Sequence, residues 1–139
     1  MRTRILGVLA VLAVVLIVAG FGFWRFGSTA NAVAYLNGDY ILADHTVEQL
    51  GPVDPGKVFD VTFNLTNVSS ESIRLVGANF SCSCLLPPSM PMDFPGGETT
   101  PVTFHFYSPQ TAMKFEELIE LYFDGPLPYV HLSITGATK

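Results

Sequence analysis

Two cysteines separated by one serine are the residues of this sequence whose types and spacing are best suited to chemistry. Cys82 and Cys84 are the only cysteines in the chain. In an extended chain, residues two apart point the same way with α-carbons about 6.6 Å apart, at the outer edge of disulfide geometry. A disulfide between them therefore requires a sharp local bend, and we expect such a bond to be easily reduced.

The same pair could instead bind a metal ion. Two thiolates on one face can hold a soft cation such as Cu(I), and Met90 and Met92 lie near enough in sequence to add thioether ligands. In a third interpretation both cysteines are small apolar residues that fill the end of the fold. One Cys-x-Cys pair is a weak signal. Cys82 and Cys84 are therefore candidate metal ligands, with Cu(I) the one cofactor considered, and the bridged and packed alternatives stay open.

The remaining polar residues do not form a catalytic set. His105 and His131 are expected on the outward faces of strands, and Glu116, Glu120 and Asp124 on one solvated stripe. The sequence contains no Ser-His-Asp order, no phosphate-binding glycine loop and no zinc-ligand spacing. We therefore expect that the protein is not an enzyme.

An uncharged apolar run covers residues 5–24. At 1.5 Å per helical residue the run spans about 30 Å, the thickness of the hydrocarbon layer of a bilayer. Arg2 and Arg4 precede it and only Arg25 follows closely, which predicts a cytoplasmic N-terminus and an exported domain. The run therefore predicts a single-pass transmembrane helix.

A cleaved signal peptide is the alternative, because Ala30-Asn31-Ala32 has the small-x-small form of a cleavage site. The apolar run is longer than an ordinary signal-peptide core, and Arg25 interrupts the approach to the site, so an uncleaved anchor is preferred. The predicted organisation is an anchor or signal peptide in residues 1–27, a linker with a small hairpin turning at Asn37-Gly38 in residues 28–45, and a β-sandwich domain in residues 46–139.

The rest of the chain alternates as half-buried strands do. The alternation is clearest in residues 58–66 and 102–107, and residues 113–123, which fit helical and strand spacing, are interpreted as a strand that pairs with residues 130–135. Three prolines make residues 86–92 a loop between sheets. Shorter strands are expected at residues 47–50, ended by Gly51-Pro52, and at residues 73–75, ended by Gly77. About seven strands with frequent turn signals predict an all-β, Ig-like sandwich preceded by one transmembrane helix.

Charge divides unevenly along the chain. Residues 26–139 hold four Lys or Arg against twelve Asp or Glu, a net charge of −8. Such an acidic field disfavours nucleic acid and anionic lipid surfaces. It is compatible with cations or with a basic protein surface, whose binding salt should weaken. We therefore expect a protein partner and no nucleic acid.

Several short motifs follow one another in a recognisable order: Leu50-Gly51-Pro52-Val53 with Pro55-Gly56, Phe63-x-Leu65-x-Asn67, Ile73-x-Leu75, Ser81-Cys82-Ser83-Cys84, Phe94-Pro95-Gly96 and Val102-x-Phe104. Over about residues 46–136 the sequence resembles the bacterial domain-of-unknown-function family numbered fifteen seventy-three. The resemblance implies export and an Ig-like sandwich similar to those of the ASPM/SPD-2/Hydin group. The family usually reads Cys-Gly-Cys-Thr in its loop, where this chain has Ser83 and Leu85.

The tether, the sandwich and the missing catalytic set together predict a non-catalytic accessory or protein-interaction subunit of an envelope complex. A single helix would hold it in the bacterial inner membrane, with the N-terminus in the cytoplasm and the C-terminal domain in the periplasm or outside the cell. Its partner would be another envelope or membrane protein. The alternative is a Cys-x-Cys copper-handling or thiol-redox carrier.

Overall fold

The structure is a computed structural model that describes residues 2–125 and 129–139, with side chains described from residue 5 onward. Two helices come first, α1 (Arg2–Phe26) and α2 (Thr29–Asn37). The strands that follow are β1 (Ile41–Ala43), β2 (Val47–Val53), β3 (Val58–Asn67), β4 (Ile73–Phe80), β5 (Leu85–Leu86), β6 (Met92–Phe94), β7 (Thr99–Tyr107), β8 (Lys114–Phe123) and β9 (Val130–Thr138).

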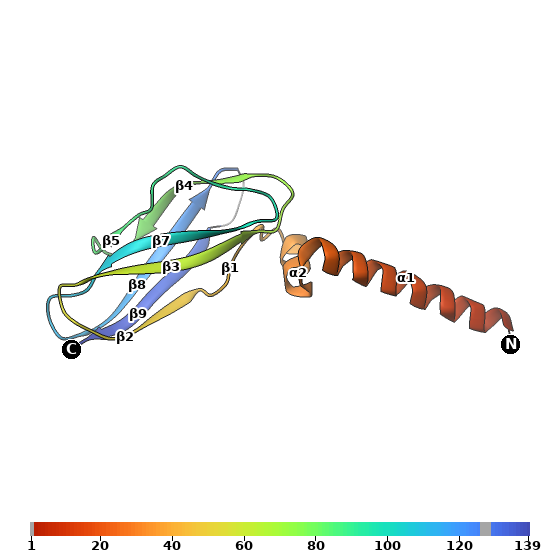
Figure 1. Cartoon of the computed structure of the whole chain (residues 1–139), viewed down its shortest axis with the longest axis horizontal. Helices are drawn as coiled ribbons and strands as arrows, with labels where there is room; N and C mark the ends of the chain where they lie inside the picture. Colours follow the sequence, from red (N-terminus) through yellow and green to blue (C-terminus); the bar gives the residue numbers. More distant parts are fainter. Residues whose placement is uncertain (1, 126–128) are drawn as a thin grey trace.

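The strands form two sheets that lie face to face as a sandwich (Figure 1). A four-stranded sheet has the order β1-β3-β7-β5, and a five-stranded sheet has the order β2-β9-β8-β4-β6. Neighbouring strands are antiparallel except β2 and β9, which pair in parallel. The predicted all-β sandwich preceded by an apolar helix is confirmed.

Aromatic rings join the two sheets in the core. Phe104 in β7 is fully buried and meets Phe63 in β3 and Phe80 in β4 edge-to-face, with ring centroids 6.1 Å apart in each pair. Phe106 in β7 and Phe115 in β8 lie 5.0 Å apart across the sandwich. Such pairs stabilise a core beyond the area that they bury.

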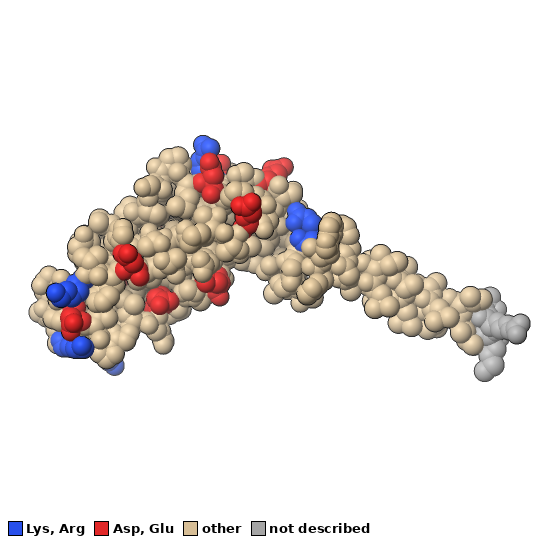
Figure 2. Space-filling view, viewed as in Figure 1, with Lys and Arg blue, Asp and Glu red and all other residues tan. Residues whose placement is uncertain are grey.

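Helix α1 projects from one end of the sandwich (Figure 1). Its segment Ile5–Phe26 is 22 residues long, has a mean hydropathy of 2.9 and is not buried against the rest of the chain. In Figure 2 the tan surface of this helix carries no charged side chain before its junction with the domain. The helix is therefore long and apolar enough to cross a membrane, a property that a signal sequence shares.

The hairpin predicted around Asn37-Gly38 is wrong, because the residues before this pair form helix α2. The Ser28 side chain accepts a hydrogen bond from the Asn31 N–H (3.1 Å) and caps the first turn. At the other end Gly38 has a φ of 86°, and its N–H donates to the Tyr35 carbonyl (3.1 Å). An Asn-Gly pair suits a hairpin turn and a helix C-terminus alike, since both need positive φ.

Two strands run past their predicted ends. Strand β2 passes through Gly51 and Pro52 with a register shift, which an edge strand tolerates because the missing N–H faces away from the sheet. Strand β4 passes through Gly77 with a similar shift. In both strands the glycine marks a β-bulge and not an end.

Two further predictions from the sequence are confirmed. Residues 113–123 contain strand β8, which pairs with β9. The proline-rich segment leads from β5 in the four-stranded sheet to β6 in the five-stranded sheet, so it crosses between the layers.

Candidate functional site

The two cysteines lie in a tight turn between β4 and β5, where the chain passes from the five-stranded to the four-stranded sheet. They form a disulfide with α-carbons 5.2 Å apart. The turn therefore supplies the bend that an extended chain lacks. The Cys84 N–H donates to Cys82 Sγ (3.2 Å), and the Tyr107 N–H donates to the Cys84 carbonyl (2.8 Å), which ties the turn to β7.

A carboxylate that the sequence analysis did not name adjoins the cysteine turn. A side-chain oxygen of Glu117 in β8 and the two sulfur atoms all lie within 4.8 Å of one another. The Ser81 hydroxyl donates to Glu117 Oε2 (2.6 Å) and accepts from the Leu118 N–H (2.8 Å). These bonds hold the carboxylate at the turn, and we call Cys82, Cys84 and Glu117 the cysteine cluster.

Strand periodicity contains the signal for Glu117. Phe115, Ile119, Leu121 and Phe123 are buried on the inner face of β8, and Glu117 lies between the first two on that same face. A charged residue at an inward strand position is rare without a partner. The pattern therefore indicates a polar site at this end of the sandwich.

The strand register does not support Met92 as a metal ligand, and Met90, in the loop before β6, packs against the hydrophobic core. Met92 in β6 pairs with Leu75 in β4. Leu75 lies five residues before Phe80, which is about 16 Å along the strand from the cysteine turn. Met92 is therefore far from the cysteine cluster.

The two histidines predicted on outer faces lie there, each beside a carboxylate. His105 Nδ1 is 2.6 Å from Asp60 Oδ1 on the four-stranded sheet, and His131 Nδ1 is 3.7 Å from Glu120 Oε1 on the five-stranded sheet. Both pairs are exposed to solvent, so they contribute little to stability. Neither pair belongs to the cysteine cluster.

An unpaired strand edge runs along the four-stranded sheet. Strand β1 covers only the end of β3, whereas β7 pairs with nearly the whole length of β3 on its other side. The Asp44 N–H donates to the Asn64 carbonyl (2.9 Å), so even-numbered residues of β3 direct their backbone groups toward the β1 side. The N–H and C=O groups of Val58, Asp60 and Thr62 therefore point outward, and no described strand pairs with them. We call these three residues the open edge.

The opposite edge of the same sheet is blocked. Strand β5 covers only the end of β7. Because the Tyr107 N–H donates toward β5, odd-numbered residues of β7 direct their backbone groups to this edge. They include Thr99, Pro101 and Thr103, and Pro101 has no N–H to donate. A proline in this position hinders the addition of a further strand.

Asp44 closes one end of the open edge. Its carboxylate accepts hydrogen bonds from Asn64 Nδ2 (2.9 Å) and from the backbone N–H groups of Asn64 (3.2 Å) and His45 (2.8 Å). Partial burial favours the neutral form of Asp44 and is the largest single influence on its pKa. The hydrogen bonds act in the opposite direction, and together they hold the pKa of this carboxyl below its ordinary value. Its stabilising contribution is present above about pH 4 and is lost as the pH falls through the lowered pKa.

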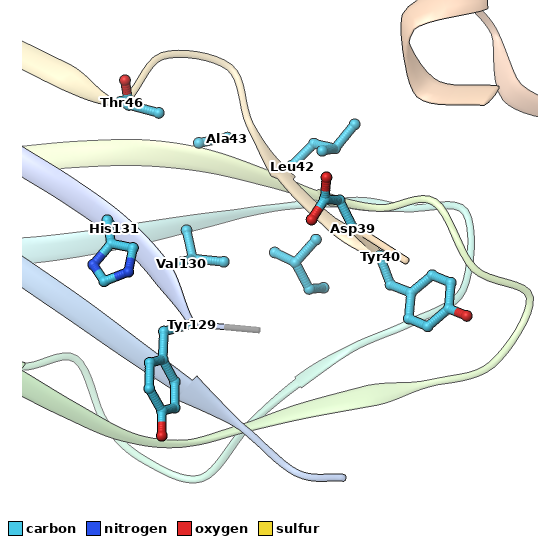
Figure 3. A pocket seen from close by; sticks show the side chains of 9 residues that line it. Asp39, Tyr40, Leu42, Ala43, Thr46, Tyr129, Val130 and His131 are labelled. Atoms are coloured by element: carbon cyan, nitrogen blue, oxygen red, sulfur yellow. The ribbon is translucent and has the colours of Figure 1, made fainter. Parts of the chain in front are cut away.

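A shallow groove of about 340 Å³ lies between β1 and the start of β9. Figure 3 shows Val130 of β9, with Tyr129 just before this strand, on the side of the groove opposite the β1 segment. Asp39 and His131 lie at opposite ends of this groove. The groove therefore does not assemble an acid–base pair.

The sequence matches the model of a family described as "Protein of unknown function (DUF1573)" over residues 41–138. The chain belongs to this family. The matched residues run from β1 into β9, so the DUF1573 domain is the whole sandwich without the two helices. No functionally curated protein matches the sequence.

Solved structures similar to the DUF1573 domain share its fold. The ASH/PapD-like domain 7 of human CEP192 has a TM-score of 0.55 at 8% identity, covering 72% of this chain and 85% of that one. WR4, an MSP family member of C. elegans, has a TM-score of 0.50 at 10% identity, covering 70% and 98%. The VesB protease of Vibrio cholerae has a TM-score of 0.54 at 16% identity, covering 78% of this chain but 35% of the protease. At these identities the likeness shows the fold alone.

Proposed function

We propose that this DUF1573 protein is a non-catalytic interaction module of the bacterial envelope that binds an extended segment of another envelope protein along its open edge. Helix α1 would hold the module in the inner membrane, with its N-terminus in the cytoplasm and the sandwich in the periplasm or outside the cell. The open edge is the observation that carries this proposal, since exposed N–H and C=O groups of a strand are a template for another strand.

The other edges of the sandwich favour the same surface. Pro101 lies on the free side of β7, and Pro52 lies within the edge strand β2. Strand β6, the remaining edge of the five-stranded sheet, is three residues long and has Pro91 and Pro95 on its two sides. Because prolines remove donors, these edges resist strand addition.

The side chains beside the open edge indicate the character of the partner. Asp44 and Asp60 have exposed carboxylates there, within a segment of net charge −8. On the inner face the half-buried Phe59 packs against the core. Side chains of a strand alternate between faces, so a partner strand with basic outward and apolar inward residues is complementary.

A pair of proline substitutions tests the open edge. Thr62 and Thr103 face each other in register with hydroxyl oxygens 2.8 Å apart, so Thr62→Pro and Thr103→Pro remove the same contact. Each N–H points out of its own edge, so neither substitution breaks a bond within the sheet. We expect Thr62→Pro to abolish co-purification of the partner from mild detergent, whereas Thr103→Pro should leave it unchanged.

Both variants must resist proteolysis like the unaltered chain for this comparison to hold. Equal retention of the partner by both folded variants, or equal loss, would show that the open edge is not the binding surface.

A further inference from the structure

The cysteine cluster places the Glu117 carboxylate next to the two sulfur atoms of Cys82 and Cys84. Glu117 is half-buried on the inner face of β8, where an unpartnered charge is costly. The Ser81 hydroxyl donates a hydrogen bond to Glu117 Oε2. Both carboxylate oxygens of Glu117 have further lone pairs available to a ligand. The arrangement is independent of the open edge, so it bears on a different property of the protein.

We propose that Cys82, Cys84 and Glu117 form a Zn²⁺ site when the disulfide is reduced. Ligand atoms around a tetrahedral Zn²⁺ lie about 3.3–3.8 Å from one another, given metal–ligand distances of about 2.0–2.3 Å. In the oxidised chain the two sulfur atoms are bonded and a Glu117 carboxylate oxygen lies within 4.8 Å of both. On reduction the sulfur atoms need only separate to about 3.8 Å while the carboxylate moves slightly closer. Two thiolates alone suit Cu(I), but the added carboxylate, a harder ligand, shifts the preference toward Zn²⁺. Water would complete the coordination.

Metal binding and the disulfide exclude each other. A dithiol reductant supplies two electrons and two protons, closes to its own disulfide, and converts the Cys82–Cys84 bond into two thiols. Zn²⁺ then displaces the two thiol protons and binds both sulfur atoms together with Glu117. The site is therefore present only in the reduced chain.

Zn²⁺ titration of the full-length protein in detergent, against a competing chromophoric chelator under anaerobic conditions, tests the site. The reduced chain should bind one equivalent, and the oxidised chain should bind none. Glu117→Gln should weaken binding at least about tenfold and leave two alkylatable thiols. Its amide oxygen can still accept from Ser81, so the turn is retained. Glu116→Gln, on the outer face of the same strand, is the matched control and should bind like the unaltered chain.

Three results would overturn the site. They are absence of Zn²⁺ binding by the reduced chain, equal binding by the oxidised chain, and equal affinity of the Glu117→Gln and Glu116→Gln variants. Cu(I) binding that is indifferent to Glu117→Gln, without Zn²⁺ binding, would instead indicate a site made by the two thiols alone.

Discussion

Phe104→Ala is expected to lower the free energy of unfolding of the sandwich by about 3–5 kcal/mol. The Phe104 ring is fully buried and lies edge-to-face against Phe63 in its own sheet and Phe80 in the facing sheet. Its removal leaves a cavity between the layers that neighbouring strands cannot fill by moving, because their backbones are fixed by pairing. The urea midpoint of protease resistance of the full chain in detergent measures this loss.

Leu118→Ala is the control for this prediction, since Leu118 is 54% exposed on the outer face of β8. We expect a change within about 0.5 kcal/mol. Similar losses for the two variants would mean that the layers are not held together by the rings between them.

Asn67→Ala is expected to lower the free energy of unfolding by about 2–4 kcal/mol. The Asn67 side chain is fully buried, and its Nδ2 donates to the carbonyls of Glu71 (2.7 Å) and Phe94 (2.8 Å). Its Oδ1 accepts from the Ser69 N–H (3.0 Å). Alanine would take this buried partner away from the Phe94 carbonyl and the Ser69 N–H, which costs more than the bonds themselves contribute.

Asn64→Ala provides the comparison, because Asn64 is exposed and its amide donates to the Asp44 carboxylate at the surface. We expect it to cost less than about 1 kcal/mol. The same urea series measures both variants, and an Asn67→Ala chain as stable as Asn64→Ala would contradict the role of Asn67 in joining the two turns.

The buried Asn67 explains why two motifs distant in sequence occur together. Its amide reaches the Phe94 carbonyl, and a side chain at Gly96 would lie 2.5 Å from the Ser70 backbone. The turn after β3 and the Phe94-Pro95-Gly96 turn therefore fit against each other only with these residues. The sequence shows the motifs, but their contact depends on strand order and becomes visible only in the fold.

Strands with one buried face could be predicted because period-two alternation follows directly from burial. This holds for β3 and β7, whose inner residues Phe63 and Phe104 are fully buried. A glycine that suits two different local structures does not show from the sequence which of the two forms. Asn37-Gly38 ends a helix, and Gly77 marks a bulge, because tertiary contacts decide between uses of the same glycine.

The two candidate sites also differ in how far the sequence predicts them. Spacing alone identified Cys82 and Cys84, and the inward position of Glu117 could have been read from the alternation of β8. The open edge could not be predicted, because the pairing of β3 depends on how few residues of β1 reach it. Strand β1 is short because the chain crosses to the five-stranded sheet after Asp44, where β2 begins at Val47.

Photo-crosslinking in intact cells tests the proposed interaction module most directly. A photoreactive residue at Val58, which is 51% exposed on the open edge, should join the full-length chain to one partner in the membrane fraction. The same residue at Thr99, on the blocked edge of β7, should give no such product. Equal products from both positions, or a shortened chain in the soluble fraction, would contradict a membrane-held module that binds its partner along β3.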